Sequence, residues 1–176
     1  GWARPEPVRF LRLAPRRGAL CDVPDLELFP ARYSVRDRVR FLAALELASG
    51  QWLFAALAAL RRGGLLSDPS RLARLVEAVG RRFDRFGTDT GGMVVRVAGV
   101  DAEGRPRRVA WHLTAGGSHG PEIPCMAAIL LARKLASGEP LPIGAHACMG
   151  FLALSDFAPE FARWDMAADI VDESDT

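Results

Sequence analysis

The chain has 176 residues, of which 49% are hydrophobic and 25% are charged, so it is long enough for a genuine core and ordinary in composition for a folded domain. Its net charge of +2 is too small to indicate a nucleic-acid partner, and no apolar run approaches the roughly 20 residues that span a membrane. The three cysteines, Cys21, Cys125 and Cys148, lack the number and spacing of a disulfide framework or zinc site, which predicts a reducing, cytoplasmic compartment and no bound metal.

The first residues predict two strands separated by an irregular segment. Residues 8–13 are a predicted strand, and so are residues 37–47, along which apolar and charged side chains alternate. Between them, residues 21–33 are interrupted by Pro24 and Pro30. Because proline disrupts regular structure, we predict a loop with a short helical turn in this segment.

Two helices are predicted next. Residues 51–62 are apolar nearly all round, which predicts either a helix buried in the core or an exposed helix at a subunit interface. Residues 68–86 predict an amphipathic helix that is capped by Asp68. Its apolar stripe consists of Leu72, Leu75, Val76, Val79, Phe83 and Phe86. We expect the arginines on its other face to be solvated, since that face also carries Glu77 and no aromatic residue.

The second half of the chain predicts further strands and helices. In order, these are a hairpin of residues 92–100 and 107–115, a helix from about residue 121, a strand at 147–154 and a short helix at 155–166. We expect residues 1–166 to form a single domain and residues 167–176 to be a frayed acidic tail. Strands interleaved with amphipathic helices indicate an α+β fold, with a mixed and largely antiparallel sheet covered on one face by helices.

The clearest candidate site is the glycine-rich turn before the helix that begins near Pro121. Gly116, Gly117 and Gly120 allow the backbone to approach a ligand closely. Unpaired N–H groups and the helix dipole favour an anion at such a position. The alternative is an ordinary capped helix that follows a glycine turn.

Ser118 and His119 are expected at the mouth of this helix, and Glu122 one residue inside it. An imidazole is an unusual choice for capping alone, where Ser, Thr, Asp or Asn serves. A protonated His119 and Glu122 could exchange a proton near neutral pH. We therefore predict catalytic roles for His119 and Glu122, and binding of a substrate or anion by Gly117, Ser118, His119 and Gly120.

The usual dinucleotide-binding fingerprint is missing from the sequence. That fingerprint requires a strand, then G-x-G-x-x-G, then a helix. The stretch GTDTGG at 87–92 has the glycines but leads from a helix to a strand, so it predicts a turn. His112 is predicted to be a surface or structural residue, and His146 is predicted to lie in a loop.

Four stretches carry a resemblance to a known family. They are CDVPDLELFPARY (21–33), VRFLAALEL (39–47), GPEIPCMAAILLARKLASG (120–138) and GAHACMGFLALSDF (144–157). Together they resemble the C-terminal part of saccharopine-dehydrogenase-like oxidoreductases, in particular bacterial members without a settled substrate. The resemblance covers nearly the whole chain.

The resemblance implies an α+β domain similar to the C-terminal domains of saccharopine reductase and glyceraldehyde-3-phosphate dehydrogenase. Such a domain shapes the substrate side of an NAD(P)-dependent oxidoreductase and mediates homodimerisation, while an N-terminal Rossmann domain holds NAD or NADP. The chain alone is then expected to be inactive and to bind no cofactor. Ser118, His119 and Gly120 would face the nicotinamide or a substrate carboxylate.

The expected partners are the chain's own Rossmann domain, a second copy and a small-molecule substrate, with no nucleic acid and no membrane. The arginines and tyrosine that bind the amino-diacid substrate in this family cannot be assigned here, where Tyr33 is the only tyrosine, so lysine metabolism does not follow. The alternative function is a non-catalytic dimerisation or interaction domain. In it, Trp52, Phe54 and Leu57 would be buried against a second copy, and the glycine turn would only cap a helix.

Overall fold

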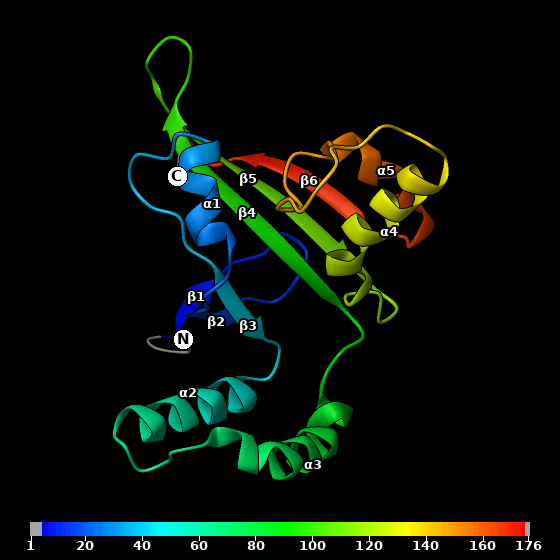
Figure 1. Ribbon diagram of the computed structural model, residues 1–176. Helices are drawn as coiled ribbons and strands as arrows, with labels where there is room; N and C mark the ends of the chain where they lie inside the picture. Colours follow the sequence, from blue (N-terminus) through cyan, green and yellow to red (C-terminus); the bar gives the residue numbers. More distant parts are fainter. Residues whose placement is uncertain (1–4, 175–176) are drawn as a thin grey trace. The chain divides into compact units, whose positions relative to one another are not determined.

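The computed structural model describes residues 5–174, which fold into two compact units (Figure 1). Unit 1 contains the residues up to Arg9 and Ala14–Thr88, and unit 2 contains Phe10–Leu13 and the residues from Asp89 onward. Each unit combines helices with a small antiparallel sheet, which confirms the α+β class. The strands are divided between two three-stranded sheets instead of one mixed sheet. Residues from both compact units fall within the range 1–166 that was expected to form one domain, and that expectation stays a prediction.

Unit 1 contains an antiparallel sheet with the strand order β1-β2-β3 and three helices. Its elements are β1 (Glu6–Val8), β2 (Arg16–Leu20), α1 (Asp25–Arg32), β3 (Leu42–Leu45), α2 (Ala48–Arg62), the 3-10 turn η1 (Pro69–Leu72), α3 (Ala73–Phe83) and the 3-10 turn η2 (Asp84–Phe86). The strand predicted at 8–13 is wrong beyond Val8, because residues 10–13 leave this sheet and belong to unit 2. The loop predicted at 21–33 is also wrong. Pro24 occupies the N-cap of α1, where a missing N–H breaks no helical hydrogen bond, and the helix continues past Pro30.

Helices α2 and α3 leave much of their apolar surface exposed. Asp68 caps η1 as predicted, since its Oδ1 accepts the Ser70 N–H at 3.0 Å. Among the residues of α2 only Gln51 is buried, so the buried-helix alternative for this segment is wrong. Most of the predicted stripe of α3 is exposed as well, with 61% of Leu75 and 59% of Phe86 open to solvent.

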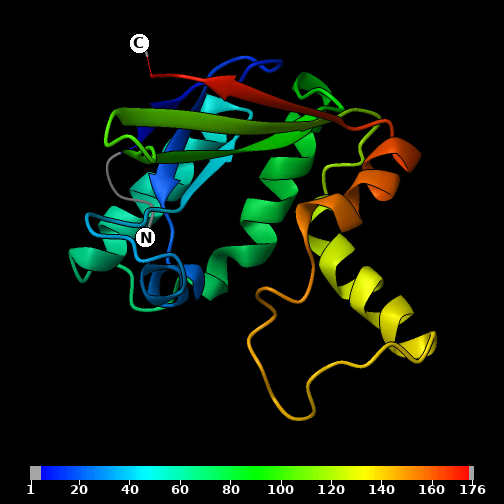
Figure 2. The same cartoon turned by 90° about the horizontal axis from the view of Figure 1, so that it is seen from above.

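Unit 2 contains a second antiparallel sheet with the strand order β4-β5-β6 and two helices. Its elements are β4 (Gly91–Val100), β5 (Pro106–Ala115), α4 (Glu122–Ala136), α5 (Leu154–Arg163) and β6 (Ala167–Asp172). The predicted hairpin is confirmed. The strand predicted at 147–154 is wrong, because the chain is irregular from α4 to α5 (Figure 2). The frayed tail predicted at 167–176 is wrong for residues 167–172, which form the strand β6 with alternating burial. Residues 175–176 lie outside the described part of the chain.

The core of unit 2 lies between its sheet and its helices. Leu113 and Ala115 on β5 pack with Met126 on α4, Phe161 on α5 and Met166 before β6. Helices α4 and α5 therefore cover one face of this sheet. The same packing fixes the start of α4, which carries the candidate site.

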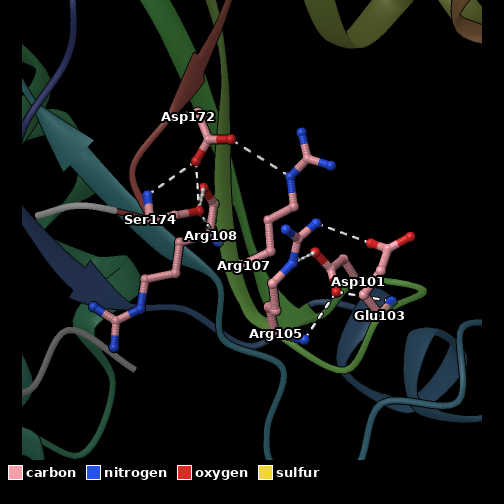
Figure 3. Close-up of polar contacts among 7 residues, drawn as sticks. All are labelled: Asp101, Glu103, Arg105, Arg107, Arg108, Asp172 and Ser174. Atoms are coloured by element: carbon pink, nitrogen blue, oxygen red, sulfur yellow. Dashed lines mark hydrogen bonds and ion pairs between the residues drawn. The ribbon is translucent and has the colours of Figure 1, made fainter.

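The turn end of the β4–β5 hairpin is held by charged side chains (Figure 3). Asp101 Oδ1 accepts the N–H groups of Glu103 (3.0 Å) and Arg105 (2.8 Å), which closes the turn. Arg107 on β5 forms an ion pair with Asp172 on β6 at 3.5 Å. The pKa of Asp101 lies below its ordinary value because its carboxylate accepts these hydrogen bonds, and the bond from the Arg105 N–H has the largest effect.

The other face of this sheet receives residues 10–13. Both Arg12 Nε and Nη2 donate to the Asp169 carboxylate on β6 at 2.7 Å. The Leu11 N–H donates to His112 Nδ1 on β5 at 3.3 Å. Because His112 is only 4% exposed and holds a backbone amide, its predicted structural role is confirmed.

The contact between Arg12 and Asp169 predicts a pH-dependent contribution to stability. The pKa of Asp169 is held below its ordinary value, first by hydrogen bonds from Arg12 and then by its charge. An acid whose pKa is lower in the folded than in the unfolded protein stabilises the fold above the unfolded pKa, and this contribution disappears as the pH falls through the folded pKa. We expect Asp169→Asn to lower the melting temperature at pH 7 and to leave it unchanged near pH 2.

The measurement is a pH series of thermal melts followed by circular dichroism. The matched control is Asp22→Asn, because the structure gives the exposed Asp22 carboxylate no hydrogen bond within the described residues. Its melting curve should follow that of the unmodified protein at every pH. An equal loss of melting temperature in the two variants at pH 7 would contradict the prediction.

Candidate functional site

The turn between β5 and α4 brings the predicted site residues to the start of α4. Gly117 and Ser118 both adopt left-handed backbone conformations, with φ of +59° and +63°. Glycine adopts this conformation without strain, whereas serine does so rarely, so Ser118 is held there by the turn around it. Pro121 then occupies the N-cap, and α4 begins at Glu122.

Two of the four residues expected to bind an anion, Ser118 and His119, have amides that already donate within the turn. Four N–H groups donate to main-chain carbonyls: Ser118 to Asp89 (2.7 Å), His119 to Gly116 (3.0 Å), Glu122 to His119 (3.3 Å) and Ile123 to Gly120 (3.2 Å). Proline at 121 and at 124 supplies no donor. The amides of Ser118 and His119 are therefore committed to the turn, whereas the amides of Gly117 and Gly120 have no main-chain acceptor within the described residues.

The glycines of this turn serve its packing. A Cβ on Gly91 would lie 3.4 Å from Cα of Gly120, so the backbone of the turn passes close to the start of β4. A Cβ on Gly117 would meet the His119 ring at 3.3 Å. Glycine at 117 thus leaves room for the imidazole of His119, whereas a Cβ on Gly120 would lie 3.7 Å from Cα of Gly91, an ordinary contact distance.

His119 and Glu122 lie together, as their spacing in the sequence predicts. Nδ1 of His119 is 3.6 Å from Oε1 of Glu122. About one third of each side chain is exposed, at 35% and 32%. This distance exceeds that of a hydrogen bond, but it is short enough for an ion pair when the imidazole is protonated.

The second carboxylate oxygen of Glu122 has a different environment. Oε2 is buried and has no hydrogen-bond partner within the described residues. Burying a carboxylate oxygen without a donor is unfavourable. The side chain therefore has one oxygen near His119 and another whose hydrogen-bonding capacity is unused within the described residues.

Trp164 is the site residue that sequence reasoning missed. Its ring lies against the His119 imidazole, with 4.7 Å between the ring centroids. The Arg163 guanidinium lies 5.6 Å from the same indole. Trp164 follows α5, far along the chain from His119, and no local pattern signals a contact between two such positions. The indole fixes the imidazole on one side, and Glu122 approaches it at Nδ1.

Ion pairs hold α5, and with it Trp164, against α4. Arg133 on α4 contacts the Glu160 carboxylate on α5, which is largely buried. Lys134 Nζ lies 3.4 Å from Oδ2 of Asp156. These contacts and the core packing keep Trp164 beside the start of α4.

The described residues form neither a metal site nor the usual dinucleotide-binding fold. Residues 5–174 contain no group of three or more His, Cys, Asp or Glu side chains that could hold a metal. All strand pairs of the two sheets are antiparallel. The parallel strands of the usual dinucleotide-binding fold are therefore absent from the described residues. Residues 87–90 of GTDTGG connect η2 to β4, and its last two glycines, Gly91 and Gly92, are the first residues of β4. His146 lies in the predicted loop.

No described helix is long and apolar enough to cross a membrane. No protein-family model, curated protein or solved structure matches the chain.

Proposed function

We propose that the chain is the substrate-side and dimerisation domain of an NAD(P)-dependent oxidoreductase similar to the saccharopine dehydrogenase family, acting on a small molecule in the cytoplasm. The observation that carries this proposal is the pair of His119 and Glu122, 3.6 Å apart and partly exposed, with the imidazole against Trp164. A histidine beside a carboxylate at the surface is suited to moving a proton during a reaction.

In this proposal the described residues supply proton transfer and orientation. His119 exchanges the proton that accompanies oxidation or reduction of the substrate. Glu122 stabilises the protonated imidazole through its Oε1, and Trp164 restricts the orientation of the ring. The hydride chemistry belongs to the nicotinamide, which would be held by an N-terminal Rossmann domain because the described residues lack the parallel strands of the usual dinucleotide-binding fold.

Nicotinamide binding tests the proposal directly. NADH and NADPH are titrated into the protein that includes the Rossmann domain and, separately, into the 176-residue chain. We expect the longer protein to quench or shift the fluorescence of one nucleotide and the shorter chain to leave both unchanged. If the longer protein gives neither fluorescence change nor thermal shift with either nucleotide, the proposal is contradicted.

A non-catalytic dimerisation domain is the second candidate, and the exposed ridge of α2 favours it. Trp52, Ala56 and Leu60 follow one another at helical spacing and are all exposed, Trp52 by 55% and Leu60 by 43%. Light scattering before and after Leu60→Arg discriminates this candidate. It requires a dimer that the substitution dissociates, and a single-chain mass in both samples would exclude it.

A further inference from the structure

Unit 1 contains a groove between α2 and α3 that its own side chains do not fill. The groove has a volume of about 660 Å³, within the range of roughly 300–1,000 Å³ that is typical of small-molecule sites. Its apolar lining consists of Leu45, Leu47, Leu53, Phe54, Val76, Val79 and Phe83. Leu53, Val79 and Phe83 remain 36%, 39% and 42% exposed there, although an amphipathic helix normally buries this stripe.

Gly80 contributes a gap in the wall of the groove. It lies in the interior of α3, where glycine costs about 1 kcal/mol relative to alanine. A Cβ at this position would meet no atom within 4 Å, and the residue does not have positive φ. No contact within the described residues therefore requires glycine here. Without a side chain at this position, the backbone of α3 is open to the groove.

Among the described side chains that line the groove, Glu46 is the one that carries a charge. The Thr88 N–H lies 3.0 Å from both of its oxygens, and the Thr88 hydroxyl donates to Oε1 at 2.6 Å. The pKa of Glu46 lies below its ordinary value. The largest cause is the hydrogen bond from the Thr88 hydroxyl, followed by the one from the Thr88 N–H, and the charge of Arg16 adds to both. The side chain is therefore a carboxylate at neutral pH.

The two oxygens of Glu46 differ in what they can still accept. Oε1 receives the Thr88 hydroxyl and is approached by Arg16 Nη2 at 4.0 Å. Within the described residues, the only donor to Oε2 is the Thr88 N–H, which is shared with Oε1. Oε2 can therefore accept a hydrogen bond from a further donor. Because the rest of the lining is apolar or neutral, the charge of the groove is complementary to a cation.

We propose that this groove binds a small amphipathic amine, with its apolar body between α2 and α3 and its ammonium group at Oε2 of Glu46. Gly80 leaves space for the apolar body beside α3. The groove belongs to unit 1 and the pair of His119 and Glu122 to unit 2, so this inference does not depend on the proposed oxidoreductase function.

The test compares two probes of equal chain length and opposite charge. Decylammonium and decanoate are titrated into the isotope-labelled chain, and binding is followed by amide chemical shifts. We expect shifts at Leu53, Gly80 and Thr88, and a dissociation constant about tenfold lower for decylammonium, since a hydrogen bond to a charged group is worth roughly 1.5–3 kcal/mol. Equal affinities, or shifts that lie outside the groove, would overturn the proposal.

Three variants separate charge from shape. Glu46→Gln keeps the side-chain shape and should remove the preference for decylammonium. Gly80→Leu fills the groove and should abolish binding of both probes, while a helix content equal to that of the unmodified chain shows that it folds. Ala78→Leu adds the same side chain to the exposed opposite side of α3 and should bind both probes normally.

Three results would overturn the proposal at this stage. The first is a charge preference that survives in Glu46→Gln, and the second is binding that survives in Gly80→Leu. The third is a dimer in light scattering that Gly80→Leu dissociates, because a second copy would then occupy the groove.

Discussion

Replacing Gly92 by alanine is expected to lower the free energy of unfolding by roughly 3 kcal/mol, the upper end of what an overpacked site normally costs. Gly92 lies on β4 opposite Thr114. A Cβ there would be 2.4 Å from the carbonyl oxygen of Leu113 and 3.1 Å from Cδ1 of Leu13. The first of these atoms belongs to the backbone of the neighbouring strand, so it cannot yield without moving β5.

Gly99 provides the matched control on the same strand. A Cβ at Gly99 would meet no atom within 4 Å, so Gly99→Ala should be neutral or stabilising by up to about 1 kcal/mol. Chemical denaturation of both variants measures the difference. Equal stabilities would contradict the close approach of β4 and β5 at Gly92.

Replacing His119 by alanine is expected to lower turnover by at least about 100-fold, the effect of losing a positioned general acid or base. Its melting temperature should change little, because His119 lies in a partly exposed turn and its ring contacts Trp164 and Glu122. The measurement is nicotinamide absorbance in a protein that joins this chain to the Rossmann domain that the proposed function requires. If His119→Ala lowers the melting temperature but leaves turnover unchanged, the role of His119 is structural.

His146 is the control for this substitution. It is exposed in the loop after α4, where its Nε2 lies 3.1 Å from the Ile143 carbonyl oxygen. His146→Ala removes the same chemical group from a position without a carboxylate partner among the described residues. Turnover should be unchanged in this variant. If His119→Ala and His146→Ala retain equal turnover, the catalytic role of His119 is wrong.

The parts of the fold that could be predicted from the sequence depend on local signals. The hairpin of β4 and β5 has alternating side chains on both sides of a short turn, so its partner strand is the next one along the chain. His119 and Glu122 are three residues apart at the start of a helix, a spacing that brings side chains together. Both predictions hold because the residues that meet are neighbours in the sequence.

The errors arise where a distant part of the chain decides the structure. The acidic composition of residues 167–172 suggested a tail, yet the segment pairs with β5 and alternates in burial like any half-buried strand. Trp164 reaches His119 only because α5 packs against α4. The division into two sheets also depends on which strands pair, and an alternating hydrophobic pattern does not specify the partner of a strand.

The insertion of Phe10–Leu13 into unit 2 has a consequence for how the protein can be divided. A fragment that begins at Asp89 would include every strand of the second sheet but lose the Arg12 guanidinium from Asp169 and the Leu11 amide from His112. Unit 2 therefore cannot be excised alone as one continuous piece with all of its contacts, whereas a fragment that ends at Thr88 keeps every segment of unit 1. A separate peptide that contains residues 10–13 would have to bind in trans before the truncated unit 2 regained these contacts.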